Sequence, residues 1–169
     1  MAFTQLALFL FSKTAGYRHE SIPAGIEGIR RLGVTSNAST VDSSEDASLI
    51  SVQNLSRYAV VIFLQTSGDL LNDEQLAGLQ SYVRAGGGFV GVHCAAAGMT
   101  REPWYGELIG AVFTDHPEPQ LGVLTIEKKK YNVIVSDLPE KWEWFDEWYN
   151  FDANPRAKVT VILSINEET

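Results

Sequence analysis

The feature that most constrains the fold is a short apolar run, Phe89 to Val92, that glycines flank on both sides and that small residues follow as far as Gly98. A continuous apolar run of this length between turn residues is typical of a buried parallel strand, and we expect it at the centre of the sheet. Small residues after it indicate a tight strand-to-helix turn, in which the side chain two positions after a glycine projects above the carboxyl edge of the sheet. Counted from Gly91, that projecting residue is His93, and Cys94 comes one position later.

Strand and helix patterns alternate through the first hundred residues. Apolar runs at Gln5 to Ser12 and Ala59 to Leu64 predict two buried strands. Helical spacing predicts one helix from Ser21 to Gly33 and another from Asn72 to Gly86, with a further strand over residues 34–41. This alternation predicts an α/β fold: a flavodoxin-like, doubly wound, mainly parallel sheet.

Ligands of such sheets bind outside the carboxyl ends of the strands, where the strand order reverses. We therefore expect the loops at residues 14–20 and 65–71 and the turn at His93 to surround one crevice. Farther along, two prolines predict a loop over residues 113–119, and Leu121 to Ile126 predicts an edge strand that Lys128 to Lys130 protect.

Composition narrows the possible partners. A length of 169 residues suits one domain with a proper core. The net charge of -8 repels phosphate backbones and argues against nucleic acid as a partner. The apolar run Leu6 to Phe11 is too short to span a bilayer, and a single cysteine cannot form an internal disulfide. We expect a cytoplasmic protein that binds a small molecule and has no membrane partner. Assembly into a homo-oligomer is an open alternative.

The chain contains three histidines, His19, His93 and His116. Each could act as a general base, a metal ligand or a donor to a sugar hydroxyl. Alternatively, His93 only locks the turn through a hydrogen bond. No close metal-ligand spacing is present, so we predict no cofactor and no metal ligands, while a divalent metal stays open because several carboxylates accompany the histidines: Asp115, Glu118, Asp146 and Glu147.

Cys94 is a weak candidate for a nucleophile. The elbow places His93 where the cysteine of a glutamine amidotransferase would stand, and we expect the thiol of Cys94 to be turned away from the crevice. The segment His116-Pro117-Glu118 imitates the signature of class I glutamine amidotransferases but follows too soon after the cysteine. A small buried cysteine is the favoured interpretation.

Several segments together resemble the ThuA-like (trehalose utilisation) family, whose fold is that of class I glutamine amidotransferases. They are Phe11 to Glu20, Gly68-Asp69-Leu70, Gly86 to His93, Phe113 to Pro117, and Asp146-Glu147-Trp148-Tyr149. The resemblance implies a role in carbohydrate metabolism, on disaccharides or their keto forms, without functional amidotransferase chemistry. It also implies a single domain over residues 1–169 that lacks a C-terminal segment of the family.

The resemblance implies a site formed by His19, His93, His116, Glu147 and Asp69. Our leading hypothesis is a sugar-metabolising enzyme that binds a small carbohydrate, with His93 and His19 as acid-base groups and Glu147 as their carboxylate partner. The substrate contacts would come from Tyr17, Arg18, Asp69, His116, Trp148 and Tyr149, because aromatic rings suit the apolar face of a sugar. Two alternatives stay open: a non-catalytic binding or interaction domain, and a Cys94-dependent amidohydrolase.

Overall fold

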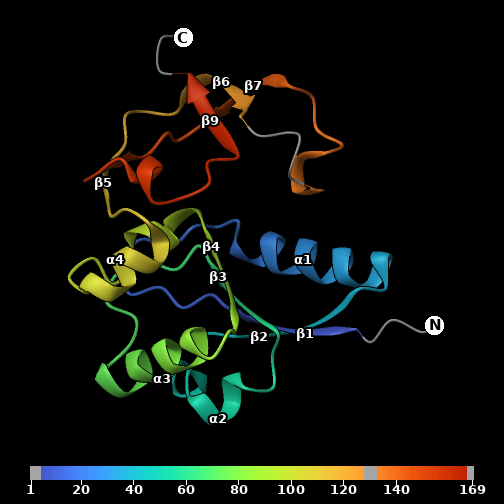
Figure 1. Ribbon diagram of the computed structural model, residues 1–169, viewed down its shortest axis with the longest axis vertical. Coiled ribbons are helices and arrows are strands. Elements are labelled where there is room, and N and C mark those ends of the chain that lie inside the picture. The colour runs from blue at the N-terminus through green and yellow to red at the C-terminus, as the bar shows by residue number, and fades with distance from the viewer. Residues whose placement is uncertain (1–4, 128–132, 167–169) are drawn as a thin grey trace. The chain divides into compact units, whose positions relative to one another are not determined.

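The structure is a computed structural model that describes residues 5–127 and 133–166 (Figure 1). It divides into two compact units, unit 1 at Met1–Ile109 and unit 2 at Gly110–Thr169. Each unit has sheets of its own. The expectation of a single domain over residues 1–169 stays a prediction, because compact units are not necessarily separate domains.

Unit 1 contains a four-stranded parallel sheet. Its strands are β1 (Leu6–Phe11), β2 (Ser39–Ser44), β3 (Val60–Leu64) and β4 (Gly88–Val92), in the order β2-β1-β3-β4. The order reverses next to β1, as in a flavodoxin-like sheet. The predicted α/β class and the three apolar runs that predicted β1, β3 and β4 are therefore confirmed.

Helices cover both faces of this sheet, with α1 on one face and α2 and α3 on the other (Figure 1). The helical elements of unit 1 are α1 (Ile22–Ser36), η1 (Ala47–Leu49), α2 (Val52–Leu55), α3 (Asp73–Arg84), η2 (His93–Ala97) and α4 (Pro103–Ile109). Strand β1 serves both layers, because successive side chains of a strand point to opposite faces. Phe9 and Phe11 join the cluster under α2 and α3, whereas Leu10 joins the cluster under α1.

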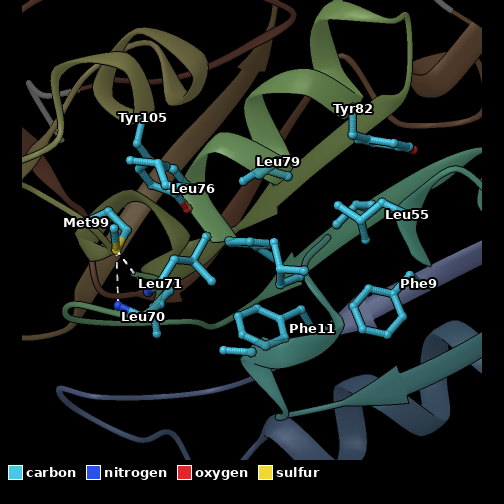
Figure 2. Close-up of a cluster of buried hydrophobic side chains, with 14 of the residues drawn as sticks. Phe9, Phe11, Leu55, Leu70, Leu71, Leu76, Leu79, Tyr82, Met99 and Tyr105 are labelled. Atoms are coloured by element: carbon cyan, nitrogen blue, oxygen red, sulfur yellow. Dashed lines mark hydrogen bonds between the residues drawn. The ribbon is translucent and has the colours of Figure 1, made fainter. Parts of the chain in front are cut away.

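The larger cluster is drawn in Figure 2 and extends from β1 to Tyr105 on α4. At its end near the site loops, the Met99 sulfur accepts the backbone N–H groups of Leu70 and Leu71, at 3.1 and 3.4 Å. The hydroxyl of Tyr105 donates to the Ala95 carbonyl at 3.0 Å. The core therefore holds the loops that follow β3 and β4 as well as the helices.

Three predictions about unit 1 are wrong in detail. Helix α1 continues past Gly33 to Ser36, and the following strand is β2 rather than residues 34–41. A Cβ at Gly33 would lie 2.7 Å from the Ser39 carbonyl oxygen, so this glycine permits close packing rather than ending the helix. Strand β4 pairs only with β3 among the described residues and is half-exposed, with Val90 at 45%. It is an edge strand of this sheet and not a central one.

Unit 2 contains antiparallel strands. Strand β6 (Gln120–Ile126) lies between β7 (Lys141–Asp146) and β9 (Leu163–Asn166), so the predicted edge strand is wrong and β6 is central. Part of the predicted loop at 113–119 is also a strand, β5 (Phe113–Asp115), which pairs with β8 (Asn150–Phe151). Two short turns of 3-10 helix are η4 (Val133–Val135) and η5 (Pro155–Ala157). Lys128 to Lys130, which we expected to protect an edge strand, lie outside the described residues.

In the part of the chain that the structure describes, no helix combines the length and the apolar character that crossing a membrane requires.

Candidate functional site

The loops that follow β1, β3 and β4 are tied together by their backbones. Thr14 pairs with Ser67, and Gly68 pairs with Gly98, in isolated parallel bridges. The Ser67 hydroxyl also donates to the carbonyl of Tyr17. The predicted meeting of these three loops at the carboxyl edge of the sheet is confirmed.

His93 stands at the predicted turn, at the first position of η2 directly after β4. Its φ is 54°, in the left-handed region that a non-glycine residue rarely adopts. Such strain is typical of elbow turns and persists only where the surrounding structure enforces it. The backbone at the end of β4 is therefore shaped to present the side chain of residue 93 to the loops.

Three potential ligand atoms converge beside this turn. The Nε2 atom of His19 lies 3.1 Å from Nε2 of His93 and 2.9 Å from Sγ of Cys94. The centroids of the two imidazole rings are 4.6 Å apart. Both rings are half-buried, and Cys94 is buried. The expectation that the thiol of Cys94 is turned away is wrong, because η2 winds the chain tightly after His93 and brings both residues to the same histidine. We call these three residues the His-Cys cluster.

Tyr17 lies against the cluster, and Asp69 lies on the loop after β3 that bridges to Gly98. The Tyr17 ring is 71% exposed and meets the His19 ring edge-on, with 4.8 Å between the centroids. Asp69 is exposed and follows Gly68, whose φ is 76°. An exposed aromatic ring beside two imidazoles could contact a polar ligand with an apolar face.

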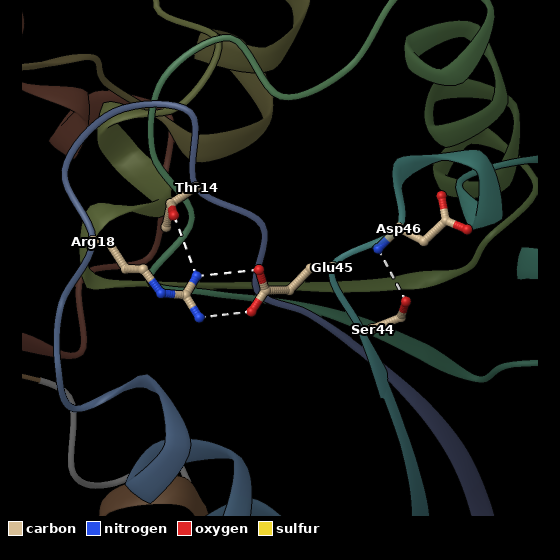
Figure 3. A network of polar contacts seen from close by, with 5 residues as sticks. All are labelled: Thr14, Arg18, Ser44, Glu45 and Asp46. Atoms are coloured by element: carbon tan, nitrogen blue, oxygen red, sulfur yellow. Dashed lines mark hydrogen bonds and ion pairs between the residues drawn. The ribbon is translucent and has the colours of Figure 1, made fainter.

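Arg18 pairs with the loop after β2, and its predicted contact with a substrate stays a prediction. Its guanidinium forms a two-point ion pair with Glu45, at 2.7 and 3.2 Å, and also donates to the hydroxyl of Thr14 (Figure 3). The hydrogen bond and the charge of Glu45 raise the pKa of Arg18. Arg18 therefore fixes the loop after β1 against the loop after β2, and Glu45 is a residue that our sequence reasoning missed. The pattern gave no signal for it, because Glu45 lies in a polar stretch without periodicity.

The other predicted site residues lie in unit 2. Nε2 of His116 lies 4.0 Å from a carboxylate oxygen of Glu147, and its Nδ1 donates to the Pro117 carbonyl at 2.8 Å. The His116 ring also stacks on Tyr149, with 5.7 Å between centroids. The structure thus brings His116, Glu147 and Tyr149 together. The predicted partnership of Glu147 with His93 stays a prediction, since the two residues belong to different units.

A cavity of about 440 Å³ lies beside this group in unit 2. Trp148 lines it, and its indole N–H donates to the Gln120 carbonyl at 2.9 Å, which fixes the ring. Our sequence reasoning missed three polar residues of the lining, Gln120, Asn150 and Asn166, and named Asp115 only as a carboxylate that could accompany a metal. They come from strands far apart in the sequence, so no local pattern indicates them. The cavity combines aromatic surface with amide and carboxylate groups, a mixture that suits a polar small molecule.

A parallel α/β unit with a histidine at the turn after β4 defines the class: an α/β protein in which two imidazoles meet at the carboxyl edge of the sheet. The sequence matches the family described as ThuA, trehalose utilisation, over residues 7–169. The chain therefore belongs to the ThuA family. The predicted family is confirmed.

Two solved structures share this fold. A ThuA-like protein from Bacteroides uniformis has a TM-score of 0.84 and 22% identity, over 99% of this chain and 71% of the other. A ThuA-like protein from Parabacteroides merdae has a TM-score of 0.75 and 18% identity, over 96% of this chain and 68% of the other. A comparison with curated proteins finds no match.

Proposed function

We propose that the chain binds a small carbohydrate at the carboxyl edge of the parallel sheet, as part of an enzyme that acts on disaccharides or their keto derivatives. The observation that carries the proposal is the contact between two half-buried imidazoles, His19 and His93, on tied loops beside the exposed ring of Tyr17. The family description, trehalose utilisation, supports the substrate class.

The histidine pair supports acid-base chemistry on hydroxyl or carbonyl groups. The two Nε2 atoms lie 3.1 Å apart. When both rings are neutral, one Nε2 carries a proton and donates it in a hydrogen bond to the lone pair of the other Nε2. A pair of this kind can donate a proton to one sugar oxygen and accept a proton from another. Tyr17 would contact the apolar face of the sugar ring.

Isothermal titration calorimetry tests the proposal. We expect trehalose, a keto derivative of it or a related sugar to release heat with the wild-type chain, and His93→Ala to bind it at least about tenfold more weakly, which corresponds to about 1.4 kcal/mol. Arg31→Ala, on the exposed side of α1, is the control and should bind as the wild type does. Absence of binding for every sugar, or an unchanged affinity in His93→Ala, would overturn the proposal.

A second candidate function is non-catalytic carbohydrate binding in unit 2, and the cavity beside Trp148 favours it. In that case Trp148→Ala should abolish sugar binding, while His93→Ala leaves it unchanged. Trp144→Ala is a matched control, because Trp144 is 55% exposed and does not line the cavity. The same titrations therefore distinguish the two candidates.

A further inference from the structure

We propose that His19, His93 and Cys94 form a binding site for a zinc-type divalent metal ion. Each residue offers one potential ligand atom, a ring nitrogen or the sulfur, and these three atoms all lie within 4.8 Å of one another. They come from two loops, with His19 after β1 and the other two residues in η2 after β4. This ligand set differs from the carboxylate-rich set that the sequence left open.

Hydrogen bonding alone accounts poorly for the cluster. Nε2 of a neutral imidazole has either one N–H or one lone pair, so it forms one well-aligned hydrogen bond. Nε2 of His19 nevertheless has two close neighbours, His93 at 3.1 Å and Cys94 at 2.9 Å. A cation at the centre of the three atoms would interact favourably with all of them at once.

The two separations from Nε2 of His19 can be compared with those of a tetrahedral zinc site. Zinc bonds of about 2.0 Å to nitrogen and 2.3 Å to sulfur separate tetrahedral ligand atoms by about 3.3 to 3.6 Å. The two separations from His19 are shorter by up to about 0.7 Å, which rotation of the imidazoles can supply because both rings are only half-buried. Nitrogen and thiolate ligands favour zinc over magnesium or calcium, which prefer oxygen.

Binding changes the protonation of the cluster in a defined way. The S–H bond of Cys94 breaks, a sulfur-to-metal bond forms, and the proton leaves to solvent. Both histidines bind through Nε2 as neutral rings that keep their proton on Nδ1. The occupied site then carries one net positive charge, in a chain whose net charge is -8.

Three protein ligands leave the fourth tetrahedral position open, as in catalytic rather than structural zinc sites. A hydroxyl or carbonyl oxygen of a carbohydrate could occupy that position, next to the exposed ring of Tyr17. This last step alone rests on the proposed carbohydrate binding, whereas metal binding does not. In the occupied site the two Nε2 atoms are metal ligands, so the acid-base role of the histidine pair belongs to the metal-free chain.

Metal binding can be measured without any sugar. Chelator-treated protein should take up one zinc ion per chain by elemental analysis after dialysis, and cobalt should replace it with a thiolate-to-cobalt charge-transfer band. Cys94→Ser should lose that band, and His19→Ala should weaken zinc binding by roughly 100-fold or more in competition with a chromophoric chelator. Circular dichroism checks that both variants keep their helices.

His116→Ala identifies the ligand set, because it removes the remaining histidine. We expect this variant to bind zinc as the wild type does, with the charge-transfer band intact. Absence of stoichiometric zinc, a cobalt spectrum without thiolate ligation, or loss of zinc from His116→Ala would each overturn the proposed site.

Sugar titrations of the metal-free and metal-loaded chain separate this proposal from the proposed function. Stoichiometric zinc without sugar binding retains the metal site and removes the carbohydrate proposal. Sugar binding by a chain that takes up no zinc retains the carbohydrate proposal and removes the metal site. Tighter sugar binding after metal loading supports both and the open coordination position as well.

Discussion

The left-handed backbone at His93 aims its imidazole, and other single residues hold the loops that meet this side chain. Tyr105 is one of them, because its hydroxyl supports the Ala95 carbonyl within η2. Gly68 is another, because its backbone bridges to Gly98 directly after η2. Substitution of either residue should change stability in a way that the local geometry predicts.

Burial raises the pKa of Tyr105, so the folded chain keeps the phenol proton to higher pH than the unfolded chain does. Stability from this residue is complete below about pH 10, where the unfolded phenol begins to ionise, and is lost as pH rises further. We expect Tyr105→Phe to cost about 1 kcal/mol at neutral pH, from the lost hydrogen bond, and to flatten the loss above pH 10. Urea denaturation at several alkaline pH values measures both effects, and an unchanged alkaline slope would contradict the argument.

Three glycine-to-alanine substitutions separate backbone strain from steric clash. At Gly68, with φ 76°, a Cβ would lie 2.7 Å from the Gly16 nitrogen, so Gly68→Ala should destabilise by about 1–3 kcal/mol. At Gly86, with φ 96° and nothing within 4 Å, only the strain remains and the cost should be smaller. Gly28→Ala, inside α1 with open space around it, should stabilise by about 0.5–1 kcal/mol. Thermal denaturation measures the order, and equal effects at Gly68 and Gly86 would show that the clash is absent.

The helices differ in how their N-termini are closed. At α3, Asn72 and Gln75 form a reciprocal capping box, at 2.9 and 3.0 Å. At α1, Ser21 occupies the N-cap position but makes no capping bond, and its hydroxyl instead bonds to Gln65 in the loop after β3. Ser21, a residue type that often caps the start of a helix, therefore forms a contact between two loops instead.

This difference gives a matched pair of variants. Asn72→Ala should destabilise the chain by about 1 kcal/mol, because backbone N–H groups of α3 lose their acceptor. Ser21→Ala should cost less than half of that, since no helix N–H depends on it. Chemical denaturation of both variants in parallel measures the comparison, and a larger loss for Ser21→Ala would contradict it.

At the scale of the whole molecule, the two units have unequal cores. Unit 1 has a large buried cluster that includes Phe9, Phe11 and Phe63, each at most 2% exposed. In unit 2, large apolar side chains of the described strands are more exposed, including Trp144 at 55% and Phe145 at 65%. A smaller buried apolar area lowers the free energy of local opening, so unit 2 should open more easily than unit 1.

Hydrogen exchange measured by mass spectrometry tests this inequality. We expect amides of β6 and β7 to exchange faster than amides of β1 and β3, because opening unit 2 exposes less apolar surface. A ligand that binds in unit 2 should slow exchange there and leave β3 unchanged. Equal protection of β3 and β6 in the free chain would show that the two units open as one.

Short-range patterns in the sequence determined much of unit 1. The continuous apolar runs predicted β1, β3 and β4, and Asn72 predicted the start of α3, because strand and cap preferences act over a few neighbouring residues. The glycine spacing placed His93 at the elbow for the same reason. Gly33 misled the prediction of the end of α1, since its role is a contact with Ser39 that only the packed sheet creates.

Only the tertiary structure decided which groups meet at the site. His19 and Cys94 are 75 residues apart, and Arg18 and Glu45 are 27 apart, so their contacts depend on strand order and register rather than on local preference. The side chains that line the cavity in unit 2 likewise come from separate strands. A local pattern can aim a side chain out of a turn, but the packing of distant segments determines what that side chain touches.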